Sequence, residues 1–200
     1  MWFGGRQKVP GFGAVVLAMT FALAGCGTGS KLGGSQAAEN VLPPRDSMPT
    51  ELGTVINKPS SRALNRKKCS FTADMPSGWC EDAVAEGHTG YGNGDGSKRL
   101  LFDVIVYRND TAAKYAFRKW NTSIRHTPSK YRIVNADKFG SESMVFVGAS
   151  GASRDDQQIV IHEGHFVGTV KFLGSGKRDA LDATLSKMSD TFVKRMQKED

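Results

Sequence analysis

The chain has 200 residues and a formal net charge of +7, and this charge is placed unevenly along it. Residues 1–68 carry nine Lys and Arg against three Asp and Glu, whereas residues 69–200 carry eighteen against seventeen. Because the larger, C-terminal part is nearly neutral, the composition argues against nucleic acid as a partner.

Residues 1–25 have the order of residue types that is typical of a signal peptide. Arg6 and Lys8 precede an apolar run over residues 12–24, and no acidic residue lies ahead of that run. The run ends in the sequence Leu-Ala-Gly-Cys at residues 23–26, which resembles the lipobox of bacterial lipoproteins.

This resemblance implies that Cys26 is acylated on its sulfur and becomes the first residue of the mature protein. Two or more acyl chains hold a protein stably on a membrane. We therefore expect a lipid-anchored protein on the extracytoplasmic face of the cell membrane. A transmembrane helix is the alternative, but it requires about 20 consecutive apolar residues and the run is shorter. An ordinary secretory peptide is disfavoured by the small residues directly before Cys26.

Residues 26–68 are rich in Gly, Ser, Pro and Asn and show no sustained hydrophobic periodicity, so we predict a flexible linker. Such a linker would hold the following domain about 35 Å from the membrane. The segment from Lys58 to Lys68, both included, has five basic residues and no acid. They favour a solvated tether over attraction to anionic lipid head groups or wall polymers, which is the functional alternative.

Cys69 and Cys80 are the other two cysteines of the chain. A pair of cysteines in an exported protein favours a disulfide, which here would close a loop of about ten residues and contribute roughly 2–3 kcal/mol. A zinc site would need a second pair of ligands, and a redox site would need Cys-x-x-Cys. We therefore predict a Cys69–Cys80 disulfide and no metal or other cofactor.

Residues 69–200 have the length of one domain, and their first clear elements are a strand and a helix. The strand covers residues 100–108, where Asp103 is a polar residue in an apolar run. The helix follows an N-cap near Asn109 and ends at Thr127-Pro128. Its apolar stripe, spaced by four, three and four residues, consists of Ala113, Phe117, Trp120 and Ile124.

Further strands are predicted over residues 131–135, 143–149 and 158–173, and a last helix from about residue 179 to 198. The strand pair in 158–173 is predicted to turn at Glu163-Gly164, with Gly168 at a possible bulge. The order of these elements predicts an α+β fold, an antiparallel sheet with two amphipathic helices packed on one face.

The run from Phe102 to Tyr107, the helix containing Trp120, the hairpin over residues 159–167 and the terminal helix together resemble small actinobacterial lipoproteins. More loosely, they are similar to the extracellular sensor domain of mycobacterial serine/threonine kinase H and to Mog1/PsbP-like sandwiches. The resemblance covers roughly residues 100–200. It implies binding or sensing and transfers no catalytic residue.

Three histidines are the candidate ligand-binding residues. His162 and His165 flank the predicted turn, which would place them opposite one another with Cβ atoms about 5 Å apart. A metal site would require a third ligand, for which His88 is the candidate. Two solvent-facing histidines are the favoured interpretation.

Other partial motifs are weaker. Residues 93–97 resemble part of a calcium loop but lack its first acid and its final Glu. Residues 174–177 resemble part of a phosphate loop. Ser150 misses the position of a nucleophile elbow, and Asp155-Asp156 is predicted to lie in a solvated turn. Trp79 and Trp120 are predicted to pack in the core.

The sequence thus favours a non-catalytic domain that binds a ligand or a protein, with a cell-envelope polymer or a membrane protein as possible partner. A small extracytoplasmic hydrolase is the alternative. A concave cleft with converging polar groups around His88, His162 or His165 would favour the hydrolase, and a flat or apolar surface would favour binding.

Overall fold

A computed structural model describes residues 33–64, 80–126, 131–148, 156–176 and 180–200. Three α-helices, two short 3-10 helices and seven strands are found in these ranges. In chain order they are α1 (Gly34–Val41), η1 (Arg45–Ser47), η2 (Thr50–Leu52), β1 (Thr54–Ala63), β2 (Ala83–Gly92), β3 (Arg99–Tyr107), α2 (Asp110–Arg125), β4 (Tyr131–Val134), β5 (Glu142–Gly148), β6 (Gln157–Glu163), β7 (Phe166–Leu173) and α3 (Ala183–Glu199).

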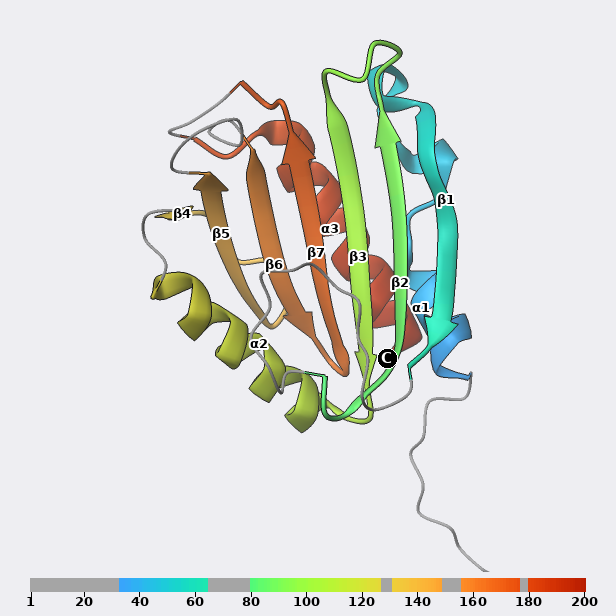
Figure 1. Cartoon of the computed structure of the whole chain (residues 1–200), viewed down its shortest axis with the longest axis vertical. Helices are drawn as coiled ribbons and strands as arrows, with labels where there is room; N and C mark the ends of the chain where they lie inside the picture. The colour runs from blue at the N-terminus through green and yellow to red at the C-terminus, as the bar shows by residue number, and fades with distance from the viewer. Residues whose placement is uncertain (1–32, 65–79, 127–130, 149–155, 177–179) are drawn as a thin grey trace, which may run out of the picture.

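The strands form a single seven-stranded sheet in the order β1-β2-β3-β7-β6-β5-β4 (Figure 1). Every neighbouring pair is antiparallel. The predicted α+β class with an antiparallel sheet is therefore confirmed. Strands β3 and β7 are neighbours in the middle of the sheet. The two regions that the sequence predicted most clearly therefore lie side by side, although 58 residues separate them in the chain.

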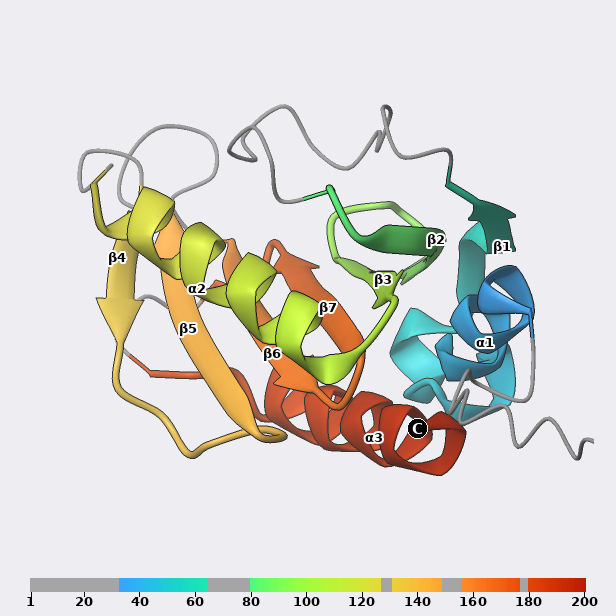
Figure 2. The ribbon, with the colours of Figure 1, turned by 90° about the horizontal axis from the view of Figure 1, so that it is seen from below.

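The prediction that both helices pack on one face is wrong, because α2 and α3 lie on opposite sides of the sheet (Figure 2). Successive residues of a strand point to opposite faces. On β3, Phe102 and Val104 belong to the core around α3, whereas Ile105 belongs to the core around α2. A central strand that is apolar on both faces requires a helix on each side.

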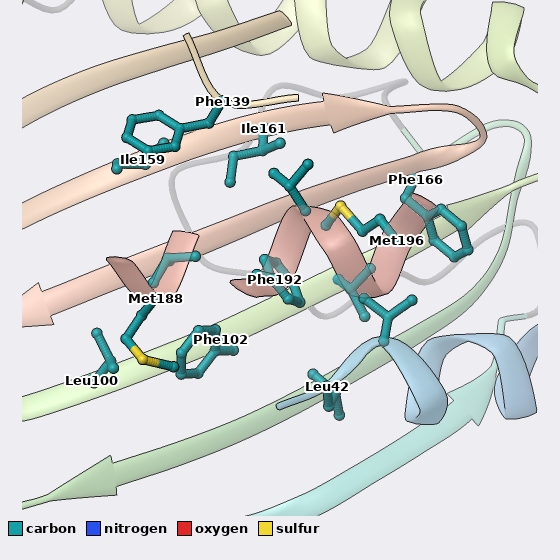
Figure 3. Packing of buried hydrophobic residues seen from close by; sticks show 14 of the residues in the cluster. Leu42, Leu100, Phe102, Phe139, Ile159, Ile161, Phe166, Met188, Phe192 and Met196 are labelled. Carbon is teal, nitrogen blue, oxygen red and sulfur yellow. The ribbon is translucent and has the colours of Figure 1, made fainter. Parts of the chain in front are cut away.

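The core around α3, which we call the first cluster, includes Phe102, Phe166, Leu185, Met188 and Phe192, all buried (Figure 3). The rings of Phe102 and Phe192 meet edge to face with centroids 5.5 Å apart. The core around α2, the second cluster, includes Ala113, Phe117, Trp120, Ile124 and Val160. The predicted core position of Trp120 is thus confirmed, and both helices are amphipathic as predicted, each with its apolar side buried.

Gly168 marks the close approach of α3 and not the bulge that its position in the sequence indicated. The register of β7 with β3 and with β6 is continuous through Gly168. A Cβ atom there would lie 2.5 Å from Phe192 Cε1 and even closer to Met196 Cε. Only glycine leaves room for α3 at this point.

The predicted flexible linker over 26–68 is wrong for residues 33–64, since these residues form α1, η1, η2 and β1. Ala38 and Val41 of α1 are buried in the first cluster. Arg195 of α3 donates hydrogen bonds to the carbonyl oxygens of Asn40 and Val41, the latter at 3.0 Å. The helix thus docks on the domain, and its last carbonyls are satisfied by a side chain of α3.

The ends of the helices follow from side-chain caps. Asn109 Oδ1 accepts from the Ala112 amide at 2.9 Å and starts α2, as predicted. Helix α3 begins at Ala183, later than predicted, with Asp182 Oδ1 accepting from the Thr184 amide at 2.8 Å. Gln157 holds the preceding residues on β6, accepting from the Asp182 amide and donating to the Ala180 carbonyl, both at 2.8 Å. This anchoring keeps residues 180–182 out of the helix.

Candidate functional site

A row of polar side chains crosses the centre of the sheet on the side where α2 lies. His88 on β2, Asp103 on β3 and Thr169 on β7 are register partners of one another in that order. Asp103 lies between Phe102 and Val104, which face the first cluster, so it points to the opposite side. Helix α2 packs over β6, β7 and the end of β3, and His88 is exposed. We call these three residues the polar row.

Asp103 is the central member of the row, and burial raises the pKa of its carboxyl group to about 6. Thr169 Oγ1 donates to Asp103 Oδ2 at 3.3 Å, and this hydrogen bond lowers the pKa. His88 and Lys171 also lower it, while Glu86 raises it. The carboxyl group therefore exchanges its proton in mildly acidic solution, where it changes from a hydrogen-bond donor to an acceptor.

An ion pair lies beside the polar row. Glu86 on β2 is 6% exposed and accepts from Arg62 of the edge strand β1 at 2.5 Å. Glu86 is the register partner of Arg62 on one side and of Ile105 on the other. The pair ties β1 to the sheet and places a second buried carboxylate near Asp103.

The three predicted histidines are not brought together. His88 lies in the polar row on β2, and His162 lies on β6, three strands away. Three strand spacings amount to about 14 Å. Within the ranges that the structure describes, there is no group of three or more His, Cys, Asp or Glu side chains that would hold a metal ion.

The predicted pairing of His162 with His165 is wrong, because the turn lies one residue further along. Glu163 pairs with Phe166 and His162 with Val167, so the turn consists of Gly164 and His165. Gly164 has a φ of +51°, a conformation that favours glycine. His162 is therefore a residue of strand β6, and His165 is a residue of the turn.

Both hairpin histidines have structural partners, contrary to the prediction that they face solvent. His162 is 2% exposed, and its Nε2 lies 3.1 Å from Asp110 Oδ1 and 3.1 Å from the Gly164 carbonyl oxygen. His165 Nδ1 lies 2.5 Å from Asp200 Oδ1, which also accepts from the His165 amide at 3.0 Å. These contacts fix the hairpin against α2 and against the end of α3.

The remaining motifs show no ligand geometry. In the loop after β2, Asn93 Oδ1 accepts from the Lys98 amide and Asp95 Oδ1 from the Ser97 amide, both at 2.9 Å. The side-chain oxygens that would bind a cation therefore accept hydrogen bonds from amides of the same loop. Asp156 Oδ1 accepts from the Gly174 amide at 3.4 Å. Trp79, Ser150, Asp155 and Lys177 lie outside the described residues.

A shallow depression of about 540 Å³ lies between the segment after β4 and the start of α3. It is lined by Asn135, Ala136, Asp137, Leu181, Ala183 and Ser186. None of the three histidines lines it. The geometry that would have favoured a hydrolase, a cleft with converging polar groups around a histidine, is not seen at this depression.

Cys80 is partly buried against the second cluster. Cys26 and Cys69 lie outside the described residues, so the lipid anchor and the Cys69–Cys80 disulfide stay predictions. Among the described residues, none of the helices is long and apolar enough to cross a membrane.

Sequence reasoning did not select Asp103, Thr169 or Glu86 as site residues. Asp103 had a visible signal, since it is the one charged residue in the run Leu-Leu-Phe-Asp-Val-Ile-Val of residues 100–106. Thr169 and Glu86 had none, because their place beside Asp103 depends on the pairing of β2 and β7 with β3.

Comparison with known proteins identifies the fold. No family model matches the chain, and no curated protein matches it in sequence. Among solved structures, it is similar to the extracellular domain of PknH from Mycobacterium tuberculosis, with a TM-score of 0.56 and 12% identity. The match covers 82% of this chain and 96% of that domain. The fold is therefore similar to that of the PknH extracellular domain, which is the similarity that the sequence predicted.

Proposed function

We propose that the chain is a membrane-anchored extracytoplasmic lipoprotein whose domain binds a ligand or a protein and performs no catalysis. The observation that carries this proposal is the polar row. Its members project from three adjacent strands of a rigid sheet, and His88 at its end is exposed. Thr169 is 3% exposed and its hydroxyl group is bonded to Asp103, so it holds the carboxyl group in place from below. The exposed His88 and the partly buried Asp103 are then the two groups that the row offers to a partner at a fixed spacing, which suits recognition.

The lipid anchor rests on the sequence at residues 23–26 and agrees with the likeness to an extracellular domain. The docking of α1 changes its geometry. Helix α1 begins at Gly34, eight residues after Cys26, and eight extended residues span at most about 28 Å. The domain of the anchored protein therefore lies closer to the membrane than the long flexible linker would have placed it.

A small hydrolase is the second candidate, and one observation favours it. Asp103 has a pKa of about 6 and is the cross-strand partner of a histidine, a combination used in acid–base catalysis. Binding is preferred because the row lies on a sheet face. The other two histidines are engaged with Asp110, Gly164 and Asp200.

The experiment is a crosslinking pull-down from native membranes with the anchored protein, comparing wild type with Asp103→Asn and His88→Ala. Asp190→Asn, at an exposed position on α3, is the matched control. We expect specific partners to be lost with the two row variants and retained with the control. Equal capture by all four proteins would contradict the proposed site. Turnover of ester or amide substrates that depends on Asp103 would favour the hydrolase.

A further inference from the structure

The outer surface of α2 is basic along its whole length. Between Asp110 and Arg125 the helix carries four cations and one acid. The cations, together with an exposed tyrosine on the same helix, form what we call the basic surface, which consists of Lys114, Tyr115, Arg118, Lys119 and Arg125.

Two acids near this surface have ion-pair partners. Asp110 lies against His162. Glu142 of β5 is shared by Lys114 and Arg118, at 3.5 and 3.8 Å. Over the described residues, no carboxylate is found within 4.0 Å of Lys119 or Arg125. A hydrogen bond with Tyr115 and the nearby charge of Glu81 both raise the pKa of Lys119. With Asp110, Glu142 and Glu81 set against its four cations, the basic surface keeps a small positive charge.

Tyr115 is the exposed aromatic residue of this surface. Its side chain is 54% exposed, and Lys119 Nζ lies 4.6 Å from the centre of its ring. A tyrosine beside lysine and arginine is the combination that proteins place at the level of lipid head groups. There the aromatic ring lies at the interface between membrane and water, and the cations bind the anionic phosphates of the head groups.

The chain that leads to the anchor enters the domain at the end of the sheet where α2 starts, although α1 packs on the opposite face. A Cβ atom at Gly34 would lie 3.0 Å from Val84 Cγ2, so α1 begins beside the start of β2. Ala83 of β2 pairs with Tyr107, three residues before α2 begins at Asp110. Both helices thus start at one end of the sheet (Figure 1).

We propose that the basic surface of α2 docks on the anionic lipid leaflet that holds the anchor and so sets the orientation of the domain. This inference rests on the lipid anchor of the proposed function. A lipid leaflet is favoured over an acidic protein because the basic surface is the outside of a helix, where a partner of fixed shape would find no recess. Anionic lipids supply charge without requiring complementary shape.

The test uses the full lipidated chain in vesicles of phosphatidylcholine alone or mixed with phosphatidylglycerol. Acetylation of lysines by a water-soluble reagent is followed by mass spectrometry. We expect Lys119 to react several-fold more slowly in the anionic vesicles and to recover in 0.5 M NaCl. Lys187, exposed on α3 across the sheet, should react equally in both.

The variant for this test is Arg118→Glu with Arg125→Glu, read out at Lys119. Each cation near an anionic surface contributes about a fivefold change in affinity, so losing two should remove most of the protection. The matched control is Lys194→Glu with Lys198→Glu, two exposed positions on α3, which should retain the protection. Circular dichroism should show both variants folded.

The outcomes separate the anchor from the docking. An unmodified N-terminus and protein free of the vesicles would show that the anchor is wrong. An acylated Cys26 with Lys119 equally reactive in both vesicles would overturn the docking alone. Equal protection by soluble phosphate polymer without vesicles would also overturn it, because the surface would then serve a polymer.

Discussion

The two faces of the sheet differ in how completely they are buried. On the face of α1 and α3, apolar side chains from β2, β3, β6 and β7 form one continuous cluster under the two helices. On the other face, α2 covers the apolar half, and the polar row and the Arg62–Glu86 pair lie beside it. The first face stabilises the fold, and the second carries the groups that suit recognition.

Under the proposed function, this difference separates stability from binding within one sheet. Successive side chains of one strand point to the two faces in turn, so that on β3 Phe102 lies in the first cluster and Asp103 in the polar row. A substitution on the first face is therefore expected to act on the free energy of unfolding, whereas one in the polar row is expected to act on binding.

The largest effect is expected at the centre of the first face. Phe192→Ala should lower the free energy of unfolding by about 3–5 kcal/mol, because a fully buried ring is lost and a cavity remains. Trp120→Ala, in the second cluster, should cost a similar or slightly smaller amount, since Trp120 is 6% exposed. Urea unfolding measures both. A cost below about 1 kcal/mol for Phe192→Ala would contradict the packing of α3.

The next effect concerns the second face. Replacing Cys80, which packs beside the second cluster, with Ser should lower stability by roughly 2–3 kcal/mol if it is bonded to Cys69. Thiol titration of the denatured protein, with and without reductant, tests the bond directly. Cys69→Ser should have the same effect as the double variant. Two free thiols in the oxidised protein would show that the predicted disulfide is absent.

Gly168→Ala should destabilise the protein by about 1–3 kcal/mol, because the added methyl group would overlap Phe192 and Met196. Gly94→Ala is the matched control, since a Cβ atom there meets nothing within 4 Å. Thermal unfolding of the two variants compares them. If Gly168→Ala were neutral, α3 would not lie as close to β7 as the structure shows.

The last effect is a pH dependence at the polar row. Asp103 has a pKa of about 6 in the folded protein against an ordinary value of 3.8, so the folded state binds a proton more readily. The protonated carboxyl group therefore makes its whole contribution to the free energy of unfolding below pH 4, and this contribution is lost as the pH rises through 6. Asp103→Asn should reduce this decline by about 1–3 kcal/mol in urea unfolding between pH 4 and 7, since each pKa unit corresponds to about 1.4 kcal/mol. An unchanged slope would contradict a buried Asp103.

Much of the fold was predictable where hydrophobic periodicity is strong. Strand β3, helix α2 and the β6–β7 hairpin were expected near their observed positions because their apolar residues repeat at strand or helix spacing. Strands β1 and β2 were missed. Strand β2 contains Gly87, Gly90 and Gly92, and β1 is an exposed edge strand interrupted by Pro59, so neither shows a regular alternation.

The errors have physical causes of the same kind. The placement of both helices on one face failed because β3 is apolar on both sides, a feature of centrally buried strands. The turn of the hairpin was predicted one residue too early, because Gly164 is the first residue of the turn and not the second. The polar row could not be predicted, since its three members come from strands that are distant in sequence.

Helix α1 has a mechanical consequence for an anchored protein. Any pull on Cys26 reaches α1 before it reaches the sheet, and α1 is held by apolar contacts and by the hydrogen bonds of Arg195. Its release, with the residues through Gly53, would lengthen the tether by up to about 70 Å while the seven strands remain paired. In a protein anchored at Cys26, the docking of α1 would therefore limit how far from the membrane the domain can reach.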